Sequence, residues 1–160
     1  MKNKDNTILI AGGGTGGHLF PALAIVRELN KKNTIYVGSK FGIESKLNIL
    51  NDFDKKYFLD ITGIHRTFSI KSIINNLIFP YKFIKSYFVS RKIIKLHRPK
   101  IIIGTGGYSS GLPLLAGISL NVKSAIHEQN SYPGITTRFL SKRVNKIFIS
   151  YKKIKDTIDG

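Results

Sequence analysis

The stretch ILIAGGGTGGHLFPALAIVREL, residues 8–29, joins a short apolar run to a glycine-rich loop and a helical pattern. The apolar run is typical of a strand buried on both faces of a parallel sheet. The helical pattern consists of apolar residues at spacings of three and four: Leu19, Ala22, Leu23, Val26 and Leu29. It predicts a helix with Pro21 in its first turn. Between strand and helix, five of the six positions 12–17 are glycine, which indicates that a ligand approaches the backbone closely.

The same alternation continues along the chain. Six short apolar runs occur, at residues 7–11, 34–38, 56–61, 100–104, 123–127 and 146–150. Longer helical patterns separate them, which predicts an α/β fold with an open parallel sheet and helices on both faces. A length of 160 residues and 42% hydrophobic composition suit one domain with its own core. Residues 101–122 carry no charge, but five glycines and a proline among them predict strand, loop and helix rather than a membrane span.

The charge distribution points to an anionic partner. The net charge is +17, and no acidic residue lies between Asp60 and Glu128, whereas residues 61–100 hold nine Lys or Arg. The chain has no cysteine, so disulfides and thiolate metal sites are excluded, and its four scattered histidines lack the spacing of zinc ligands. These features favour a reducing, cytoplasmic setting and predict no metal centre.

Two glycine-rich loops and one polar segment follow predicted strands. Residues 12–17 follow the first strand, and GTGGYSSG, residues 104–111, follows the fourth and leads into a helix expected to begin near Leu112 and Pro113. HEQN, residues 127–130, ends the fifth strand. Ligands bind beyond the carboxyl ends of parallel strands, and glycine loops before helices bind phosphate. We therefore expect both loops at one sheet edge, as phosphate-binding sites.

The first loop does not fit the commonest phosphate-binding signatures. Gly12, Gly14 and Gly17 satisfy G-x-G-x-x-G, but Ser39 and Lys40 stand where a dinucleotide-binding domain has an acidic residue. NAD is therefore disfavoured, while NADP stays open as a weak alternative. A Walker loop is excluded, because His18 stands where its lysine would be.

GGTGGH (13–18), GGYSSG (106–111) and HEQN, in this order and at these intervals, resemble the MurG family of peptidoglycan N-acetylglucosaminyltransferases. The resemblance covers essentially the whole chain. It implies the N-terminal, Rossmann-like half of a GT-B glycosyltransferase, which binds the acceptor, while a C-terminal domain binds most of UDP-GlcNAc. On this resemblance residues 1–160 are the acceptor domain, ending before its last strand and without the donor domain, and the chain alone should transfer no GlcNAc.

The reaction implied by the resemblance is an inverting transfer of GlcNAc to the 4-hydroxyl of undecaprenyl-diphosphate-linked MurNAc-pentapeptide, converting lipid I to lipid II. UDP-GlcNAc is then a substrate, and no cofactor is expected. An inactive fragment or a nonenzymatic lipid-diphosphate binding module is the alternative. A nucleic-acid partner is not expected, because no recognition motif occurs and the glycine loops would go unexplained.

The resemblance also implies roles for individual residues. His18 would be the general base, which suits a neutral imidazole near pH 7, with Glu128 as the rival base or the group that orients the acceptor. Four residues would contact the donor: Thr15, Gly16, Gly17 and Asn130. Nine would contact the acceptor: Gly13, Gly14, Gly106, Gly107, Tyr108, Ser109, Ser110, His127 and Gln129. No Asp-x-Asp motif occurs, so helix dipoles and cationic side chains would stabilise the leaving group.

Residues 70–97 combine apolar residues at helical spacing with six basic ones, and Pro80 is expected to break or kink this helix. One interpretation is an ordinary helix packed on the sheet. The other, strengthened by a lipid-linked acceptor, is docking on an anionic membrane through Leu77, Tyr81, Ile84 and Phe88. The protein would then be peripheral, on the cytoplasmic face of the bacterial inner membrane.

Overall fold

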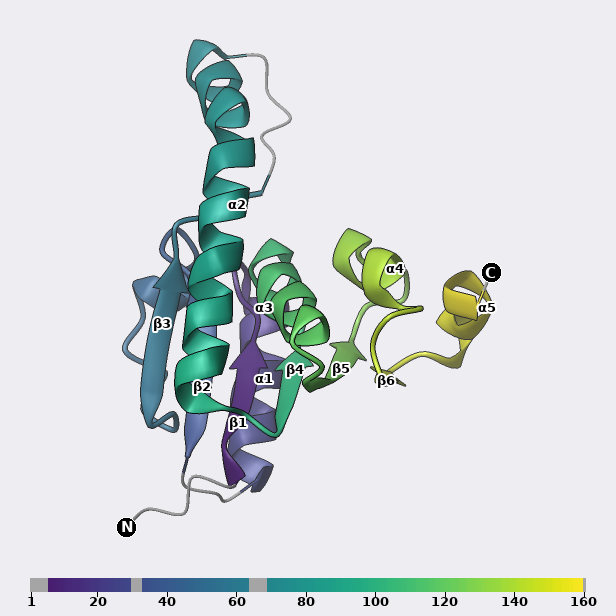
Figure 1. Cartoon of the computed structure of the whole chain (residues 1–160). Coiled ribbons are helices and arrows are strands. Elements are labelled where there is room, and N and C mark those ends of the chain that lie inside the picture. Colours follow the sequence, from purple (N-terminus) through teal and green to yellow (C-terminus); the bar gives the residue numbers. More distant parts are fainter. Residues whose placement is uncertain (1–5, 30–32, 64–68, 160) are drawn as a thin grey trace.

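The computed structural model describes residues 6–29, 33–63 and 69–159. Strands and helices alternate along this part of the chain (Figure 1). The strands are β1 (Ile8–Ala11), β2 (Thr34–Ser39), β3 (Lys55–Leu59), β4 (Ile101–Gly104), β5 (Lys123–Glu128) and β6 (Lys146–Ile149). The helices are α1 (Gly16–Leu29), α2 (Ile70–His97), α3 (Tyr108–Ser119), α4 (Ile135–Leu140) and α5 (Lys155–Asp159), with short 3-10 turns η2 (Ile43–Ser45) and η3 (Lys152–Ile154). Each strand predicted from the sequence is confirmed to within two residues at either end.

The six strands form one parallel sheet in the order β3-β2-β1-β4-β5-β6. In the register, Ile10 of β1 lies opposite Tyr36 of β2 on one side and Ile103 of β4 on the other. The strand order therefore reverses between β1 and β4, where an open parallel sheet leaves a crevice at its carboxyl edge. Both glycine-rich loops lie at this edge, because they follow β1 and β4, so their expected placement is confirmed.

Side chains alternate between the two faces of the sheet, and each face has its own core. On one face, Ile10 of β1 and Tyr36 of β2 pack with Leu19 and Val26 of α1. On the other, Leu9 of β1 packs with residues of α2, α3 and α4. The expected arrangement, an open parallel sheet with helices on both faces, is confirmed.

Three helix details differ from expectation. Pro21 is the sixth residue of α1 rather than part of its first turn, because α1 already begins at Gly16. The helix α3 begins at Tyr108, four residues before the expected Leu112. The prediction of a break at Pro80 is wrong, because α2 is one helix of 28 residues that contains Pro80. It is capped by Ser69 at its start and by Arg98, in the left-handed conformation, at its end. A proline removes only one backbone donor, and α2 is anchored beyond it in the core by Ile93 and Ile94.

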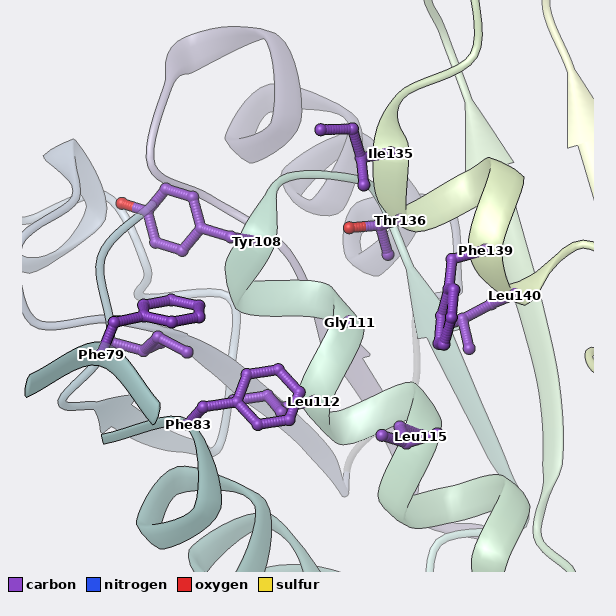
Figure 2. A pocket seen from close by; sticks show the side chains of 11 residues that line it. Phe79, Phe83, Tyr108, Gly111, Leu112, Leu115, Ile135, Thr136, Phe139 and Leu140 are labelled. Atoms are coloured by element: carbon purple, nitrogen blue, oxygen red, sulfur yellow. The ribbon is translucent and has the colours of Figure 1, made fainter. Parts of the chain in front are cut away.

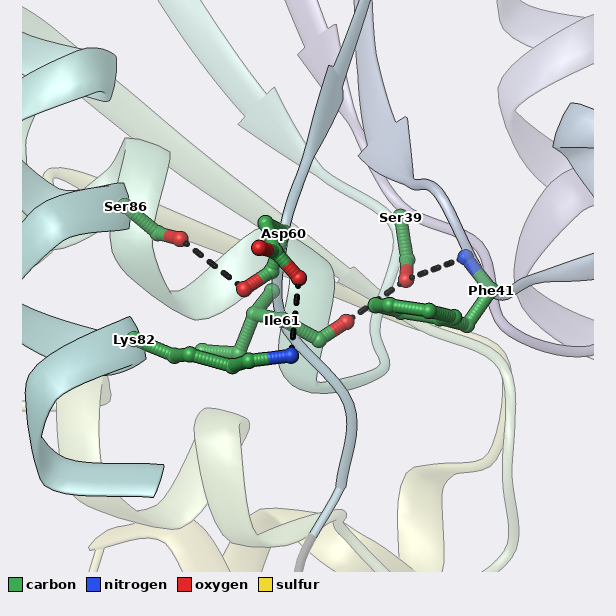
Figure 3. A network of polar contacts seen from close by, with 6 residues as sticks. All are labelled: Ser39, Phe41, Asp60, Ile61, Lys82 and Ser86. Atoms are coloured by element: carbon green, nitrogen blue, oxygen red, sulfur yellow. Dashed lines mark hydrogen bonds and ion pairs between the residues drawn. The ribbon is translucent and has the colours of Figure 1, made fainter. Parts of the chain in front are cut away.

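A polar network fixes α2 against the loops that follow β2 and β3 (Figure 3). The Lys82 ammonium lies 3.0 Å from the Asp60 carboxylate and 5.2 Å from the centre of the Phe41 ring. The Ser39 hydroxyl donates to the Ile61 carbonyl oxygen at 2.6 Å. Lys82 therefore serves partly to hold α2 in place, in addition to adding positive charge to the basic surface expected around this helix.

The N-terminal half of α2 extends past the carboxyl ends of the strands (Figure 1). Apolar side chains are uncovered there: the exposed fraction of Leu77 is 79%, and Tyr81 is exposed as well. Ile84 and Phe88, which follow in the second half of α2, are also exposed. An ordinary helix packed along its whole length would bury such a stripe. Among the described helices, none is long and apolar enough to span a membrane.

Candidate functional site

The first glycine loop is shaped by a buried carboxylate that sequence reasoning missed. Glu44 of η2 is 1% exposed, and it accepts hydrogen bonds from the backbone N–H of Gly14 and of Ser39, both at 2.8 Å. A Cβ on Gly13 would lie 2.2 Å from a Glu44 oxygen, and the backbone at Gly13 has a φ of +134°. Glycine is thus required here by Glu44 as well as by backbone conformation. Because the N–H of Gly14 donates to Glu44, it is not available to bind a phosphate, which this loop was expected to do.

The second glycine loop packs directly on the first. Gly106 and Gly107 have φ values of +100° and +76°, and a Cβ on Gly107 would lie 2.5 Å from the carbonyl oxygen of Gly13. The Thr105 hydroxyl, 2.7 Å from the carbonyl oxygen of His18, ties this loop to the start of α1. The N-terminus of α3, which begins at Tyr108, therefore meets the N-terminus of α1 at the crevice between β1 and β4. Two helix N-termini at one point favour an anionic ligand.

His18 lies in the first turn of α1, with its ring against the second loop. A Cβ on Gly106 would be 2.5 Å from the ring atom Nδ1. That nitrogen lies 2.7 Å from the amide nitrogen of Gln129. His18 is thus held by groups from β4, β5 and their loops while its side chain lines a cavity.

The carboxylate of Glu128, at the end of β5, accepts four hydrogen bonds. One oxygen accepts from the hydroxyl of Thr137 at 2.5 Å and from the N–H of Gly134 at 3.0 Å. The other accepts from the side-chain amide of Asn130 at 2.8 Å and from its backbone N–H at 3.1 Å. Burial alone would raise the pKa of Glu128, but these hydrogen bonds, led by that of Thr137, hold the pKa below its ordinary value of 4.5. The carboxylate consequently fixes Asn130 and the start of α4.

A cavity of about 550 Å³ brings many of the predicted residues together, and we call it the polar cavity because His18, Glu128 and Asn130 line part of its otherwise largely apolar wall. His18, Glu128 and Asn130 line it, along with Gly106, Gly107 and Tyr108 of the second loop, Gly134, and Ile135, Thr136 and Thr137 of α4. The other residues expected to bind substrate do not line it: Gly13, Gly14, Thr15, Gly16, Gly17, Ser109, Ser110, His127 and Gln129. Thr15 and Gly17 are exposed.

The roles expected for the side chains of Ser109 and Ser110 do not fit their positions. Both residues are 0% exposed, and the hydroxyl of Ser110 donates to the carbonyl oxygen of Gly107 at 2.9 Å. They lie buried in the first turn of α3, and neither lines the cavity. A contact between their hydroxyls and a diphosphate is therefore not supported.

An apolar cavity of about 280 Å³ adjoins the polar one (Figure 2). Phe79 and Phe83 of α2 point into it from one side, and Ile135 and Phe139 of α4 from the other, above Leu115 and its neighbours on α3. The two cavities share four lining residues: Phe79, Tyr108, Ile135 and Thr136. A ligand with a polar head and an apolar chain could occupy both.

Within residues 6–29, 33–63 and 69–159, no group of three or more His, Cys, Asp or Glu side chains could hold a metal ion. Among the described residues, those with polar side chains that line the site are His18, Tyr108, Glu128, Asn130, Thr136 and Thr137.

Comparison with known proteins identifies the family. The family described as "Glycosyltransferase family 28 N-terminal domain" matches residues 8–149. The UDP-N-acetylglucosamine--N-acetylmuramyl-(pentapeptide) pyrophosphoryl-undecaprenol N-acetylglucosamine transferase of Christiangramia forsetii is 42% identical over 153 residues, which are 93% of this chain and 40% of that protein. The transferase of the same name from Lactococcus lactis subsp. lactis is 41% identical over 90% of this chain and 40% of its own length.

A solved structure gives the same result. The crystal structure of Acinetobacter baumannii MurG matches with a TM-score of 0.77 and 28% identity, over 92% of this chain and 42% of that one. The chain spans about 40% of the length of the curated relatives it matches. Because the family match extends over most of its residues, the chain belongs to the glycosyltransferase family 28 N-terminal domain family.

Proposed function

We propose that this chain is the acceptor-binding half of an inverting N-acetylglucosaminyltransferase of peptidoglycan synthesis. In this proposal, GlcNAc passes from UDP-GlcNAc to the 4-hydroxyl of MurNAc-pentapeptide carried on undecaprenyl diphosphate. The observation that carries the proposal is a polar cavity at the crevice between β1 and β4 that adjoins an apolar cavity. The name of the 42% identical relative from Christiangramia forsetii contains the same sugar and a pyrophosphoryl-undecaprenol acceptor.

His18 is the group we assign as general base. It takes the proton of the acceptor hydroxyl as the oxygen bonds to the anomeric carbon and the bond from that carbon to UDP breaks, which inverts the configuration. UDP leaves with its negative charge, which helix N-termini and cationic side chains stabilise. No cofactor takes part in this scheme, and UDP-GlcNAc is a substrate.

Glu128 suits a supporting role better than that of base. A base needs a free lone pair and a pKa near the working pH, whereas the Glu128 carboxylate accepts four hydrogen bonds and its pKa is lowered. It holds the side-chain nitrogen of Asn130, which leaves the Asn130 carbonyl oxygen to accept from a sugar hydroxyl. We therefore assign Asn130 to sugar binding and Glu128 to its orientation.

The adjoining cavities suit a lipid-linked diphosphate. We assign the sugar and diphosphate to the polar cavity, near the N-terminus of α3, and the first isoprene units to the apolar cavity between α2, α3 and α4. The aromatic rings of Phe83 and Phe139 would cover the chain where it leaves the diphosphate (Figure 2).

Replacing Phe139 by Ser tests this assignment. We expect about 5- to 30-fold weaker binding of a polyprenyl diphosphate to the 160-residue chain, because one or two kcal/mol of apolar contact is lost. Binding can be measured by titration calorimetry in detergent. Inorganic pyrophosphate should bind both proteins equally, because it does not reach the apolar cavity.

Phe148→Ser is the matched control. Phe148 is 48% exposed against 63% for Phe139, and both rings lie near a basic side chain, but Phe148 does not line the cavity. The Phe148→Ser variant should bind the polyprenyl diphosphate as tightly as the wild type does. Equal losses in both variants, or no loss in either, would show that the apolar cavity does not hold the prenyl chain.

We further propose that the exposed stripe of α2 (Leu77, Tyr81, Ile84 and Phe88) docks on an anionic membrane at the cytoplasmic face of the inner membrane. The stripe begins, with Leu77 and Tyr81, on the half of α2 that extends past the carboxyl edge of the sheet, the same edge as the site (Figure 1). A net charge of +17 would draw this face to anionic lipid. The acceptor's prenyl chain would then reach the site from the bilayer.

Changing Leu77, Tyr81 and Ile84 together to Ser should reduce partitioning onto vesicles containing anionic lipid by about tenfold or more in a sedimentation assay. The thermal midpoint should stay nearly unchanged, because these side chains are exposed and contribute little to the core. Leu47→Ser, on an exposed residue outside α2, is the control and should partition normally. High salt should weaken binding without abolishing it. Normal partitioning of the triple variant would count against docking through α2.

A further inference from the structure

The ring of His18 is fixed in place by its surroundings. The hydroxyl of Thr105 donates to the His18 carbonyl oxygen at 2.7 Å, which anchors its backbone. The ring lies against backbone of the second glycine loop: a Cβ on Gly106 would be 2.5 Å from Nδ1, and one on Gly107 would be 3.1 Å from Cδ2. With the ring held between these groups, the chemistry of His18 depends on which of its two nitrogens carries the proton.

Gln129 contacts one of these two nitrogens. Its side-chain nitrogen lies 2.7 Å from Nδ1 of His18, and among the residues that the structure describes its side-chain oxygen is buried without a partner. An amide nitrogen can only donate, so Nδ1 is the acceptor, and a neutral imidazole then carries its proton on Nε2. The reverse orientation of the amide would bury two N–H donors at the position that now holds one unpartnered oxygen.

We propose that Gln129 is a positioning residue that sets the proton position on His18, and that in this structure it holds the tautomer protonated at Nε2. In this form Nε2 donates a hydrogen bond and takes no proton. Rotation of the Gln129 amide by half a turn would bring its oxygen to Nδ1, and exchange with water would then remove the proton from Nε2 and place one on Nδ1, which leaves the lone pair of Nε2 free. Only then does His18 act as a base, and on receiving a proton it becomes an imidazolium with both nitrogens protonated.

The catalytic consequence rests on the proposed function, but the proton position does not. Gln129 is the single glutamine of the chain, and it follows Glu128, whose carboxylate is fixed by four donors. Successive residues of HEQN therefore have separate tasks: Glu128 holds Asn130 and α4, while Gln129 holds His18. Gln129 itself does not line the polar cavity and acts on the site through His18.

Nuclear magnetic resonance of the 160-residue chain with ¹⁵N-labelled histidine tests the proposal. At about pH 8, where free histidine is neutral, the wild type should show His18 protonated at Nε2 only. Gln129→Glu puts an obligatory acceptor at Nδ1, so the proton should move to Nδ1. Gln129→Met keeps the side-chain volume without the hydrogen bond, so the single-tautomer signal should be lost in favour of a mixture.

His97 is the internal control. Its Nε2 lies 2.7 Å from the hydroxyl of Tyr57, on β3, and its ring signals should be the same in all three proteins. A wild type protonated at Nδ1, or a His18 tautomer unchanged in Gln129→Met, would overturn the proposal even if Gln129→Glu does not fold. Because no transfer is measured, these outcomes are independent of whether the proposed reaction occurs.

Discussion

Replacing His18 by Ala should lower the rate of GlcNAc transfer by about 10²- to 10⁴-fold, the usual contribution of a positioned general base. The measurement requires a donor-binding half, so we would join this chain to the remaining part of the Christiangramia forsetii relative, of which it matches 40%. The loss should fall on kcat, with little change in acceptor binding, because the proton moves only in the transition state. By the same reasoning, the 160-residue chain alone should transfer no GlcNAc, because only one of the two reactants is held.

Glu128→Gln in the same chimera separates the two candidate bases. It should reduce kcat less than His18→Ala at a temperature where both proteins remain folded, since Glu128 acts through Asn130 rather than on the reacting hydroxyl. If His18→Ala kept nearly full turnover while Glu128→Gln lost it, the roles assigned here would be reversed. Rapid transfer by the isolated chain would contradict the division of substrates between two domains.

Glu128→Gln should also lower the free energy of unfolding of the isolated chain, by roughly 2–4 kcal/mol in urea denaturation. The new amide nitrogen would face the donors of Thr137 and Gly134 or those of Asn130, so at least one buried donor pair loses its acceptor. Thr137→Val removes a single donor and should cost less, about 1 kcal/mol. Equal stability of Glu128→Gln and the wild type would show that these contacts contribute nothing net.

Glu128 should also make the free energy of unfolding depend on pH. The pKa of Glu128 is lowered in the folded protein, so its stabilisation is fully present above the ordinary pKa of 4.5 and is lost as pH falls through the lower, folded value. The difference in free energy of unfolding between the wild type and Glu128→Gln should therefore shrink as the pH is lowered from 5 toward 3. This range begins near the ordinary pKa and extends below it, because the pKa of Glu128 is shifted downward. Parallel stability curves for the two proteins over this range would argue against a lowered pKa.

Much of the fold follows from short-range patterns in the sequence. Apolar runs of five or six residues, followed by apolar residues at helical spacing, located all six described strands and the helix α1. The glycine loops were placed correctly at one sheet edge, because in any parallel sheet the loops after adjacent strands meet there. Helix ends were less accurate, as at Tyr108 and Pro80, since hydrophobic periodicity reports the buried stripe of a helix and says little about where the helix starts or whether it continues.

Patterns along the chain are enough to place the residues of the site at the carboxyl edge of the sheet, but their contacts depend on how distant segments pack against one another. Glu44 meets Gly14 from 30 residues away, and Gln129 meets His18 from 111 residues away. Nor does the order of residues show that Ser109 is buried or that Glu128 accepts four hydrogen bonds. The physical reason is that strand and helix formation depends on neighbours within a few residues, whereas a hydrogen bond depends on distances of about 3 Å that are set only when the loops pack together.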